Sequence, residues 1–498
     1  MSSFLGIDLG TTFSAMATID DSGRPVIVHN SEGENITPSC VTEEDGAVEV
    51  GEFARRAWGA DNTSAAARFK REMGTDKKYR LNEHSFNPVE LSSFVLKKLA
   101  QDAEKSIGEI GEVVVTVPAN FANDAREATM QAAKKAGLNV NYIINEPTAA
   151  ALFYSHKNGG DFHGNYAVYD LGGGTFDVSI IRVDGHQVDV LATNGVSKLG
   201  GDDFDRLLVE LVQRKYKDQT GETLEPEDFT SNNAEDEKKS LSKRKSVLIR
   251  VNKKQIELKR EEYEEAISNL VTQAELLCES SIEEANLAVS DIKAVLLAGG
   301  STRIPMVRHS IERVFGQKPL DSANVDEVVA LGAALYAAYR GDRSQLSAAQ
   351  AATIDKINVT EITSKCFGTL AMIHNEARNE QKLANSILIY KGDKIPASVT
   401  ESFFTMHDDQ DAVDCRVTES VAPETDPAFV KIIWDGNLDL PSGRPAGQEI
   451  KITYTYDSNQ IMRCSFVDVA TSKKTEIEIS MTQTSPEGES KIDQFLVE

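Results

Sequence analysis

Two short runs of aspartate, glycine and threonine carry the clearest chemical signal in this chain. Residues 6–12 read GIDLGTT, and residues 170–175 read DLGGGT. Glycines let backbone N–H groups approach phosphate oxygens without interference from a Cβ atom, and threonine hydroxyls add further donors. Bare carboxylates would repel a phosphate. Asp8 and Asp170 therefore suit such loops only if a divalent cation or its waters lie between their carboxylates and the phosphate. The runs therefore predict a Mg-nucleotide site rather than a site for phosphate alone.

Each run lies between two short apolar segments. Residues 4–7 and 13–19 flank the first run, and residues 166–169 and 176–183 flank the second, so each run is expected at the tip of a β-hairpin. One Gly-rich hairpin alone is weak support, because an ordinary turn has the same composition. The internal repeat instead indicates two equivalent α/β subdomains that face each other across a ligand-binding cleft.

Two helix starts follow apolar strands in the first half of the chain. Residues 113–118 are expected to form a buried strand ended by proline, with Asn123 as the N-cap of a helix over residues 124–137. Residues 142–144 form another strand, and Glu146 then stands at a strand-to-helix corner, where active-site carboxylates are often found.

Three further segments can be interpreted either as ordinary structural features or as parts of a functional site. Residues 295–303 predict a strand that enters a Gly-Gly turn, whose backbone can approach a nucleoside, with Arg303 free to stack on a flat base. Lys70 lies in a short basic cluster, and an isolated lysine is usually a surface charge. Residues 222–245 are highly charged, which by itself is typical of a solvated surface helix.

Composition limits the classes of partner. The 498 residues carry a formal net charge of −25, with 78 acidic against 53 basic side chains, so nucleic acids and anionic membranes would be repelled. The five cysteines are odd in number and have no CxxC spacing, which argues against a disulfide framework and against a zinc site. Neither a basic leader nor a run of 18 apolar residues occurs, so we expect a cytoplasmic protein.

The periodicity of the chain changes near residue 340. Residues 1–340 alternate strand-like and helix-like segments, whereas residues 358–480 alternate apolar and polar positions as in a small antiparallel β-sandwich. Residues 341–357, small and polar, are expected to form a linker or a short surface helix. Residues 481–498 are polar and are expected to be a flexible tail.

Taken together, these segments resemble the heat-shock-70 (DnaK-type) chaperone family. The resemblance runs in order from about residue 4 to residue 480 and is closest to short, specialised bacterial members without a helical lid. The segments that carry it are residues 6–12, 70–71, 117–118, 145–151, 170–177, 199–205, 299–305 and 330–334.

The resemblance implies an actin-like ATPase domain, a duplicated ribonuclease-H-like fold of two lobes, followed by the β-sandwich. It implies ATP or ADP, Mg²⁺ and K⁺ as cofactors, with Asp8 and Asp170 holding Mg²⁺ through its waters. The residues implied in hydrolysis are Lys70, Glu146, Asp177 and Thr175. Those implied in nucleotide binding are Gly10, Thr11, Thr12, Phe13, Gly172, Gly173, Gly174, Thr175, Gly201, Asp202, Glu235, Lys238, Lys239, Ser242, Gly299, Gly300, Ser301 and Arg303.

The resemblance also implies that Pro118 and Arg126 form a switch that responds to the γ-phosphate. Unfolded or apolar peptide segments would bind in the β-sandwich, at Met372, Phe403, Met406 and Val413; ordinary core packing is an equal alternative for Phe403 and Val413. A J-domain co-chaperone and a nucleotide exchange factor are the implied protein partners. The implied activity is protein folding under stress, driven by slow ATP hydrolysis.

Departures from the family pattern leave an alternative open. The leucine-rich linker of the family is replaced by residues 352–358, ATIDKIN, and the family arginine used in sensing a J-domain is Tyr142 here. Lys239 stands where family members often carry arginine, and the 18 residues given after residue 480 are expected to be too short for the helical lid of the family. The alternative is a nucleotide-holding co-chaperone or scaffold with weak interdomain coupling. A small-molecule kinase on the same scaffold is a third hypothesis, but it does not explain the β-sandwich.

Overall fold

The computed structural model describes residues 3–44, 46–60, 63–159, 161–375, 380–458, 461–478 and 495–498. The chain forms two compact units. Unit 1 comprises residues 1–121, 128–359 and 484–498, and unit 2 comprises residues 122–127 and 360–483. Among the described residues, no helix has both the length and the apolar character needed to cross a lipid bilayer.

Unit 1 contains two central sheets with the same strand pattern. In the first, β1 (Ser3–Asp8), β2 (Phe13–Ile19) and β3 (Pro25–Val28) form an antiparallel meander, and β10 (Ile110–Val117) and β11 (Val140–Asn145) join β1 in parallel. In the second, β12 (His163–Leu171), β13 (Phe176–Asp184) and β14 (Gln187–Val196) repeat the meander, and β17 (Ile292–Ala298) joins β12 in parallel. Both predicted hairpins are present, with the glycine runs at their tips.

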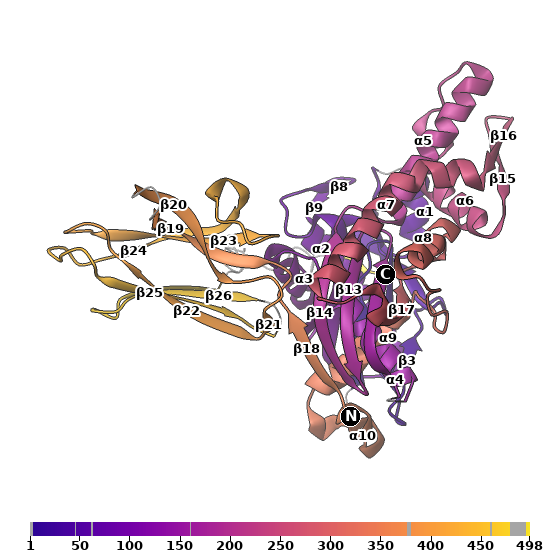
Figure 1. Ribbon diagram of the computed structural model, residues 1–498. Coiled ribbons are helices and arrows are strands. Elements are labelled where there is room, and N and C mark those ends of the chain that lie inside the picture. The colour runs from indigo at the N-terminus through magenta and orange to yellow at the C-terminus, as the bar shows by residue number, and fades with distance from the viewer. Residues whose placement is uncertain are drawn as a thin grey trace. The chain divides into compact units, whose positions relative to one another are not determined.

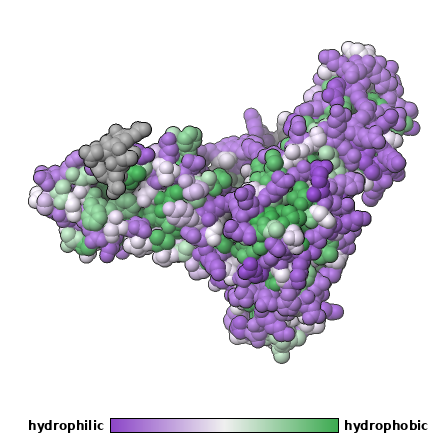
Figure 2. Space-filling view, in the orientation of Figure 1, coloured by the Kyte–Doolittle hydropathy of each residue, from purple (hydrophilic) through white to green (hydrophobic). Residues whose placement is uncertain are grey.

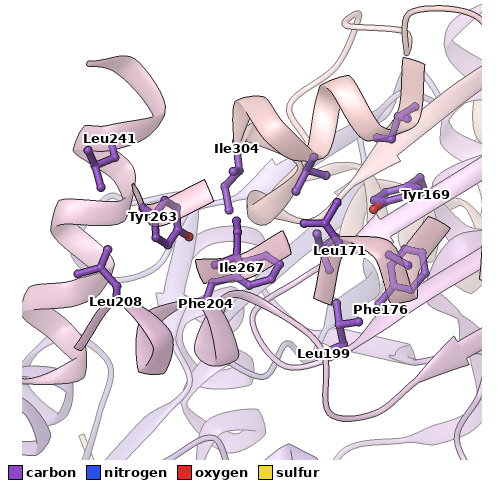
Figure 3. Packing of buried hydrophobic residues seen from close by; sticks show 14 of the residues in the cluster. Tyr169, Leu171, Phe176, Leu199, Phe204, Leu208, Leu241, Tyr263, Ile267 and Ile304 are labelled. Atoms are coloured by element: carbon purple, nitrogen blue, oxygen red, sulfur yellow. The ribbon is translucent and has the colours of Figure 1, made fainter. Parts of the chain in front are cut away.

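The second sheet is covered by long helices that share its core. The helices α5 (Gly201–Thr220), α7 (Arg260–Glu284) and α8 (Pro305–Phe315) pack around it, and α7 crosses β13 and β14 (Figure 1). Figure 3 shows Phe204 and Ile267 from two of these helices beside Leu171 and Leu199, all of them buried. This core fixes Leu171, and therefore the glycine run that follows it.

A close helix crossing connects the two sheets. The helix α4 (Glu146–Lys157) begins directly after β11, as predicted, and packs against α9 (Val328–Arg340). A Cβ atom at Gly332 of α9 would lie 1.7 Å from the carbonyl oxygen of Ala149 in α4. Only glycine permits this approach, because any side chain would push the helices apart.

The charged segment of residues 222–245 does form a helix, α6 (Ser231–Lys243). Its first turn is capped by Thr230, whose side chain accepts a hydrogen bond from the Asn233 N–H. The helix is followed by the hairpin of β15 (Ser246–Val251) and β16 (Lys254–Lys259). Figure 2 shows a largely hydrophilic surface over this part of unit 1.

A small four-stranded sheet lies in the N-terminal part of unit 1. The strands β5 (Cys40–Glu44), β6 (Ala47–Val50) and β7 (Ala65–Ala67) pair with β28 (Leu496–Val497) at the edge of β6. Residues 479–494 of the expected flexible tail lie outside the described residues. Residues 495–498 are not a flexible tail, because Phe495 and Val497 are buried and the backbone pairs with β6.

The stretch expected as a linker folds onto unit 1. It contains α10 (Ala348–Ile354), which Ser347 caps by accepting a hydrogen bond from the Gln350 N–H. The Gln350 amide donates to the carbonyl oxygen of Ile19, 3.1 Å away, and Ile354 is fully buried. The chain therefore passes from unit 1 to unit 2 after Val359 rather than at the polar stretch.

Unit 2 is built from two four-stranded antiparallel sheets. One contains β20 (Glu380–Ile389), β19 (Cys366–Asn375), β23 (Ala412–Ser420) and β24 (Lys431–Asp439); the other contains β22 (Ala397–Phe404), β25 (Glu449–Tyr456), β26 (Met462–Asp468) and β27 (Lys474–Glu478). Side chains from both sheets, including Phe367, Val417, Tyr454 and Phe466, form one buried core. The hairpin partners β18 (Asn358–Ile362) and β21 (Lys394–Ile395) begin the unit.

One predicted helix boundary is wrong by a residue. Asn123 was expected to cap the helix from outside, but α3 (Asn123–Lys135) already includes it. Its side-chain Nδ2 donates a hydrogen bond to the Glu127 carboxylate one turn later, at 3.2 Å, within the helix itself.

Candidate functional site

The two glycine runs meet at one cavity of about 430 Å³ in unit 1. This volume lies within the range of small-molecule sites in proteins. The predicted site residues that line the cavity are Asp8, Gly10, Thr11, Thr12, Phe13, Lys70, Glu146, Asp170, Gly172, Gly173, Thr175, Gly201, Asp202, Glu235, Lys238, Lys239, Ser242, Gly299, Gly300, Ser301 and Arg303.

The tips of the two hairpins pack directly against each other. A Cβ atom at Gly173 would lie 1.8 Å from the Thr12 hydroxyl oxygen, and one at Gly174 would lie 2.6 Å from a side-chain carbon of Thr11. Any side chain at these glycines would force the loops apart. The Thr12 hydroxyl is buried at the cavity wall and has no hydrogen-bond partner among the described residues, so it is available to donate to a ligand.

At Gly172 the second glycine run is open toward the cavity. The nearest atom that its Cβ would meet is the Thr175 carbonyl oxygen, 4.0 Å away, so a side chain here would project into free space at the cavity wall. The Gly172 carbonyl oxygen accepts hydrogen bonds from the Gly201 N–H at 3.0 Å and from the Ser301 hydroxyl at 2.9 Å. The first turn of α5 and the turn after β17 are therefore fixed to the second glycine run.

The floor of the cavity is an acidic centre with one buried lysine. Lys70 follows β7 in a short 3₁₀ turn, Phe69–Glu72, and its Nζ lies 2.5 Å from Glu146 Oε1. Both side chains are almost inaccessible to solvent. Asp8 accepts a hydrogen bond from the Thr116 hydroxyl at 3.0 Å, and Asp177, behind the cavity wall, accepts one from the Asn120 N–H at 3.1 Å.

Two aspartates at the cavity, Asp8 and Asp170, have raised pKa values. Burial, together with the charge of Glu146, raises the pKa of Asp8 to about 7, although Lys70 and Thr116 oppose the shift. Burial and the charges of Glu146, Asp177 and Asp8 raise the pKa of Asp170 well above its usual range. Carboxylates crowded in this way favour a bound cation, which offsets their repulsion.

We predict that Asp8→Asn stabilises the nucleotide-free protein and impairs its function. Because the pKa of Asp8 is higher in the folded than in the unfolded chain, ionised Asp8 weakens folding as pH rises from 4 to 7. Asparagine keeps an acceptor for Thr116 without the charge, so we expect Asp8→Asn to be more stable than the parent chain at pH 8 and about equally stable at pH 4. Denaturant unfolding at both pH values measures this. An equal gain at pH 4 and pH 8 would contradict the electrostatic cause.

One face of α6 borders the cavity, at Glu235, Lys238, Lys239 and Ser242, the residues for which the family resemblance implies nucleotide contacts. Lys238 Nζ lies 2.7 Å from Asp205 and donates to the Gly201 carbonyl oxygen at 3.0 Å, so it ties α6 to the start of α5. Although burial alone would raise the pKa of Glu235, the charges of Lys239, 2.6 Å away, and of Arg55, 3.0 Å away, lower it to about 2.

Arg303 differs from its expectation. It was expected to be free to stack on a flat base, but its guanidinium pairs with Asp326 at 2.8 Å and donates to Asn324 at 2.8 Å. The Arg303 side chain still lines the cavity, so Asp326 holds the guanidinium at the cavity wall rather than drawing it away. Two cations lie over the Phe13 ring: Lys239 Nζ is 5.3 Å and the Arg55 guanidinium carbon 5.9 Å from its centre.

Asp202 also has a more restricted environment than predicted. Its carboxylate is buried and lies 2.9 Å from the Arg68 Nε, and its N–H donates to the Gly173 carbonyl oxygen at 2.7 Å. The side chain therefore ties the start of α5 to the loop that carries Lys70. We assign it to holding the two halves of the site together more than to direct contact with a ligand.

The prediction missed several residues at the cavity. Asp205 lies in a segment quoted for the family resemblance, and its i, i+3 spacing from Asp202 was a usable signal. The apolar side chains carried no chemical signal in the sequence. The missed residues are Ile36, Asp205, Lys243, Ile304, Val325, Asp326 and Val329.

Four predicted residues lie outside this cavity lining. Gly174 lies at the tip of the second hairpin and packs against Thr11, and Asp177 is buried in β13 of the same hairpin. Pro118 directly follows β10 and is buried, and Arg126 is fully buried on α3.

The four predicted peptide-contact residues lie in unit 2 in two kinds of environment. Phe403 of β22 and Val413 of β23 are partly buried against the core, as the alternative of core packing allows. Met372 of β19 is 44 % exposed, and Met406, after β22, is 36 % exposed. Met372 pairs with Leu383 of β20, and Phe404 is also strongly exposed; the prediction named neither. Figure 2 shows hydrophobic residues at the surface of this unit.

Tyr142, which departs from the family pattern, is in contact with an arginine from another element. Tyr142 of β11 lies under the guanidinium of Arg340, which is 3.9 Å from the ring centre. Arg340 is the last residue of α9, so a positive charge reaches this strand from the neighbouring helix.

The chain matches a model of a protein family. The family is described as Hsp70 protein, and the matched stretches are residues 4–81 and 77–497. Together they span nearly the whole chain and both units.

Proposed function

Because the chain belongs to the Hsp70 family, an ATP-binding chaperone family of protein folding and the stress response, we propose that it is a chaperone that hydrolyses ATP in the cavity of unit 1. In this proposal unit 1 is an actin-like ATPase domain of two lobes and unit 2 is a peptide-binding β-sandwich. The observation that carries the proposal is the meeting of both glycine runs, Lys70 and one face of α6 around a single cavity.

The lining of the cavity suits a nucleoside triphosphate. The unpartnered Thr12 hydroxyl and the open space beside Gly172 suit phosphate oxygens, while Lys238, Lys239 and Ser242 of α6 line the side we assign to the nucleoside. Asp8 and Asp170 would hold Mg²⁺ through its waters, and this chemistry neutralises phosphate charge. Their raised pKa values support a cation at this place.

Hydrolysis would depend on position and charge. Lys70, held by Glu146, would neutralise the γ-phosphate and help to place the attacking water. Glu146 and Thr175 would orient that water, and Asp177 would contribute with them to the metal and K⁺ environment. In this scheme the oxygen of water forms a bond to the γ-phosphorus, the bond to the β–γ bridging oxygen breaks, and ADP and phosphate leave without a covalent intermediate on the protein. The family resemblance implies that this turnover is slow, as for a timer.

Unit 2 would bind an extended apolar peptide. Met372, Met406 and Phe404 provide exposed apolar surface on a two-sheet scaffold whose core is already filled. Main-chain hydrogen bonds to an extended peptide would give broad tolerance for its sequence. Phe403 and Val413 would then support the site from the core side.

Coupling between nucleotide and peptide is proposed to pass through Pro118 and Arg126. The folded α10 and the Arg340 guanidinium over Tyr142 indicate that this chain uses different groups from those of the family pattern in the linker and J-domain regions. The second candidate, a co-chaperone that holds nucleotide with weak coupling, is favoured by the same two features.

Peptide affinity in the two nucleotide states distinguishes the candidates. We expect the full chain to bind a labelled apolar peptide at least about tenfold more weakly with ATP than with ADP, since differential affinity is what a coupled chaperone requires. Fluorescence anisotropy of the labelled peptide measures both affinities on the same preparation of the full chain. Equal affinities despite ATP hydrolysis would favour the weakly coupled candidate.

A further inference from the structure

The chain returns to unit 1 after unit 2 and adds a strand there. Strand β28 pairs in parallel with β6, with Leu496 opposite Ala47 and Val497 opposite Val48. The Glu498 N–H donates to the Val48 carbonyl oxygen at 2.9 Å, and the Val50 N–H donates to the Glu498 carbonyl oxygen at 3.1 Å. The segment thus satisfies backbone groups at a strand edge that would otherwise be exposed.

An aromatic pocket beside this edge receives Phe495. The Phe495 ring lies 5.1 Å from the His84 ring, 5.4 Å from Phe86 and 5.9 Å from Phe94, measured between centroids, and meets all three in edge-to-face geometry. The residues come from β9 (His84–Phe86) and from α2 (Pro88–Ile107). Phe495 is 7 % exposed, so its ring is almost fully removed from water.

The docked segment has a clear inner and outer face. Phe495 and Val497 are buried, whereas Leu496 between them is 63 % exposed. Since side chains alternate across a strand, an apolar residue at every second position is sufficient for this docking. A short extended peptide bound by strand addition, with one aromatic anchor, has the same features.

We propose that the β6 edge and the His84–Phe86–Phe94 pocket form a second peptide-docking site, located on the ATPase unit, for an extended Phe-x-Val segment. Its resident occupant is the chain's own segment Phe495–Glu498. The occupied sheet continues through β5 to β7, which leads directly into Lys70, so the site lies on the element that positions that lysine. The occupant is held in cis, which gives it a high effective concentration.

A like-charge pair opposes the docking. Partial burial and the Glu498 carboxylate raise the pKa of Glu49 in β6, while Lys98 of α2 lowers it. The docked state therefore takes up a proton more readily than the free segment does. Glu49→Gln is expected to strengthen docking, and docking of the parent chain is expected to weaken as pH rises above the usual range of a glutamate.

Hydrogen exchange of residues 47–50 in the full chain tests the proposal without nucleotide or chaperone activity. Phe495→Ala removes the anchor, so we expect the exchange protection of the Val50 amide to fall by about tenfold or more. Leu496→Ala alters the neighbouring exposed side chain and is expected to leave protection unchanged, and Glu49→Gln should raise it. Unchanged protection in Phe495→Ala would overturn the proposal.

A peptide added in trans tests whether the site is exchangeable. In the Phe495→Asp chain, the peptide QFLVE at millimolar concentration is expected to restore protection of residues 47–50, and QSLVE is not. Because the readout is local to β6, binding of peptide to unit 2 does not mimic it. Failure of QFLVE to restore protection would show that the edge is not a peptide site.

Discussion

Lys70→Ala is expected to abolish ATP turnover while the chain still binds ATP. Removing one pre-positioned group that stabilises developing charge typically costs about 100-fold to 1,000-fold in rate. The nucleoside side of the cavity is formed by other residues, so affinity should change far less than turnover. Single-turnover hydrolysis and equilibrium ATP binding, measured on the same preparation, give the two quantities.

The main alternative cause of such a loss is a damaged fold. Lys70 and Glu146 are buried and 2.5 Å apart, so removing one partner leaves the other uncompensated and costs about 3–5 kcal/mol. The double variant Lys70→Ala/Glu146→Gln removes that uncompensated charge and should recover stability but not turnover. Turnover of Lys70→Ala at the parent rate would contradict the assignment of Lys70 to catalysis.

Gly172→Val is expected to remove nucleotide binding without unfolding the protein. The nearest atom to a Cβ at this position is 4.0 Å away, so the folded chain accommodates the substitution within about 0.5 kcal/mol. The same side chain would occupy the place where phosphate oxygens approach the loop, and we expect affinity to fall at least about 100-fold. Thermal unfolding and calorimetric titration with Mg-ATP separate the two effects.

Gly332→Ala provides the opposite control. A Cβ atom there would lie 1.7 Å from the Ala149 carbonyl oxygen, so α4 and α9 must separate, at a cost of about 3 kcal/mol or more. Gly332 does not line the cavity, so affinity should be retained at temperatures where the variant is folded. If Gly172→Val instead lowered stability as much as Gly332→Ala does, this would contradict the free space beside Gly172 at the cavity wall.

The parts of the site that were predictable are those with strong local signals. Both glycine runs lie at hairpin tips because apolar strands flank them, and Glu146 begins α4 because a strand ends at Asn145. The family resemblance placed Glu235, Lys238 and Lys239 of α6 at the nucleotide site, and all three line the cavity. For the glycine runs and Glu146, the local pattern and the observed fold agree.

The parts that were not predictable depend on partners distant in sequence. The pairing of Arg303 with Asp326 and of Asp202 with Arg68 arises from packing between separate elements, which the spacing of single residues does not encode. Residues 495–498 are the clearest case. A polar tail is expected to remain solvated, yet one phenylalanine and an available strand edge are sufficient to dock its end.

Phosphate release from ATP by the purified full chain, with Mg²⁺ and with no acceptor added, tests the central claim most directly. We predict slow, continuous release that requires Mg²⁺ and is absent in Lys70→Ala. Binding of ATP without release, or release only when a small-molecule acceptor is supplied, would contradict an ATPase in this cavity.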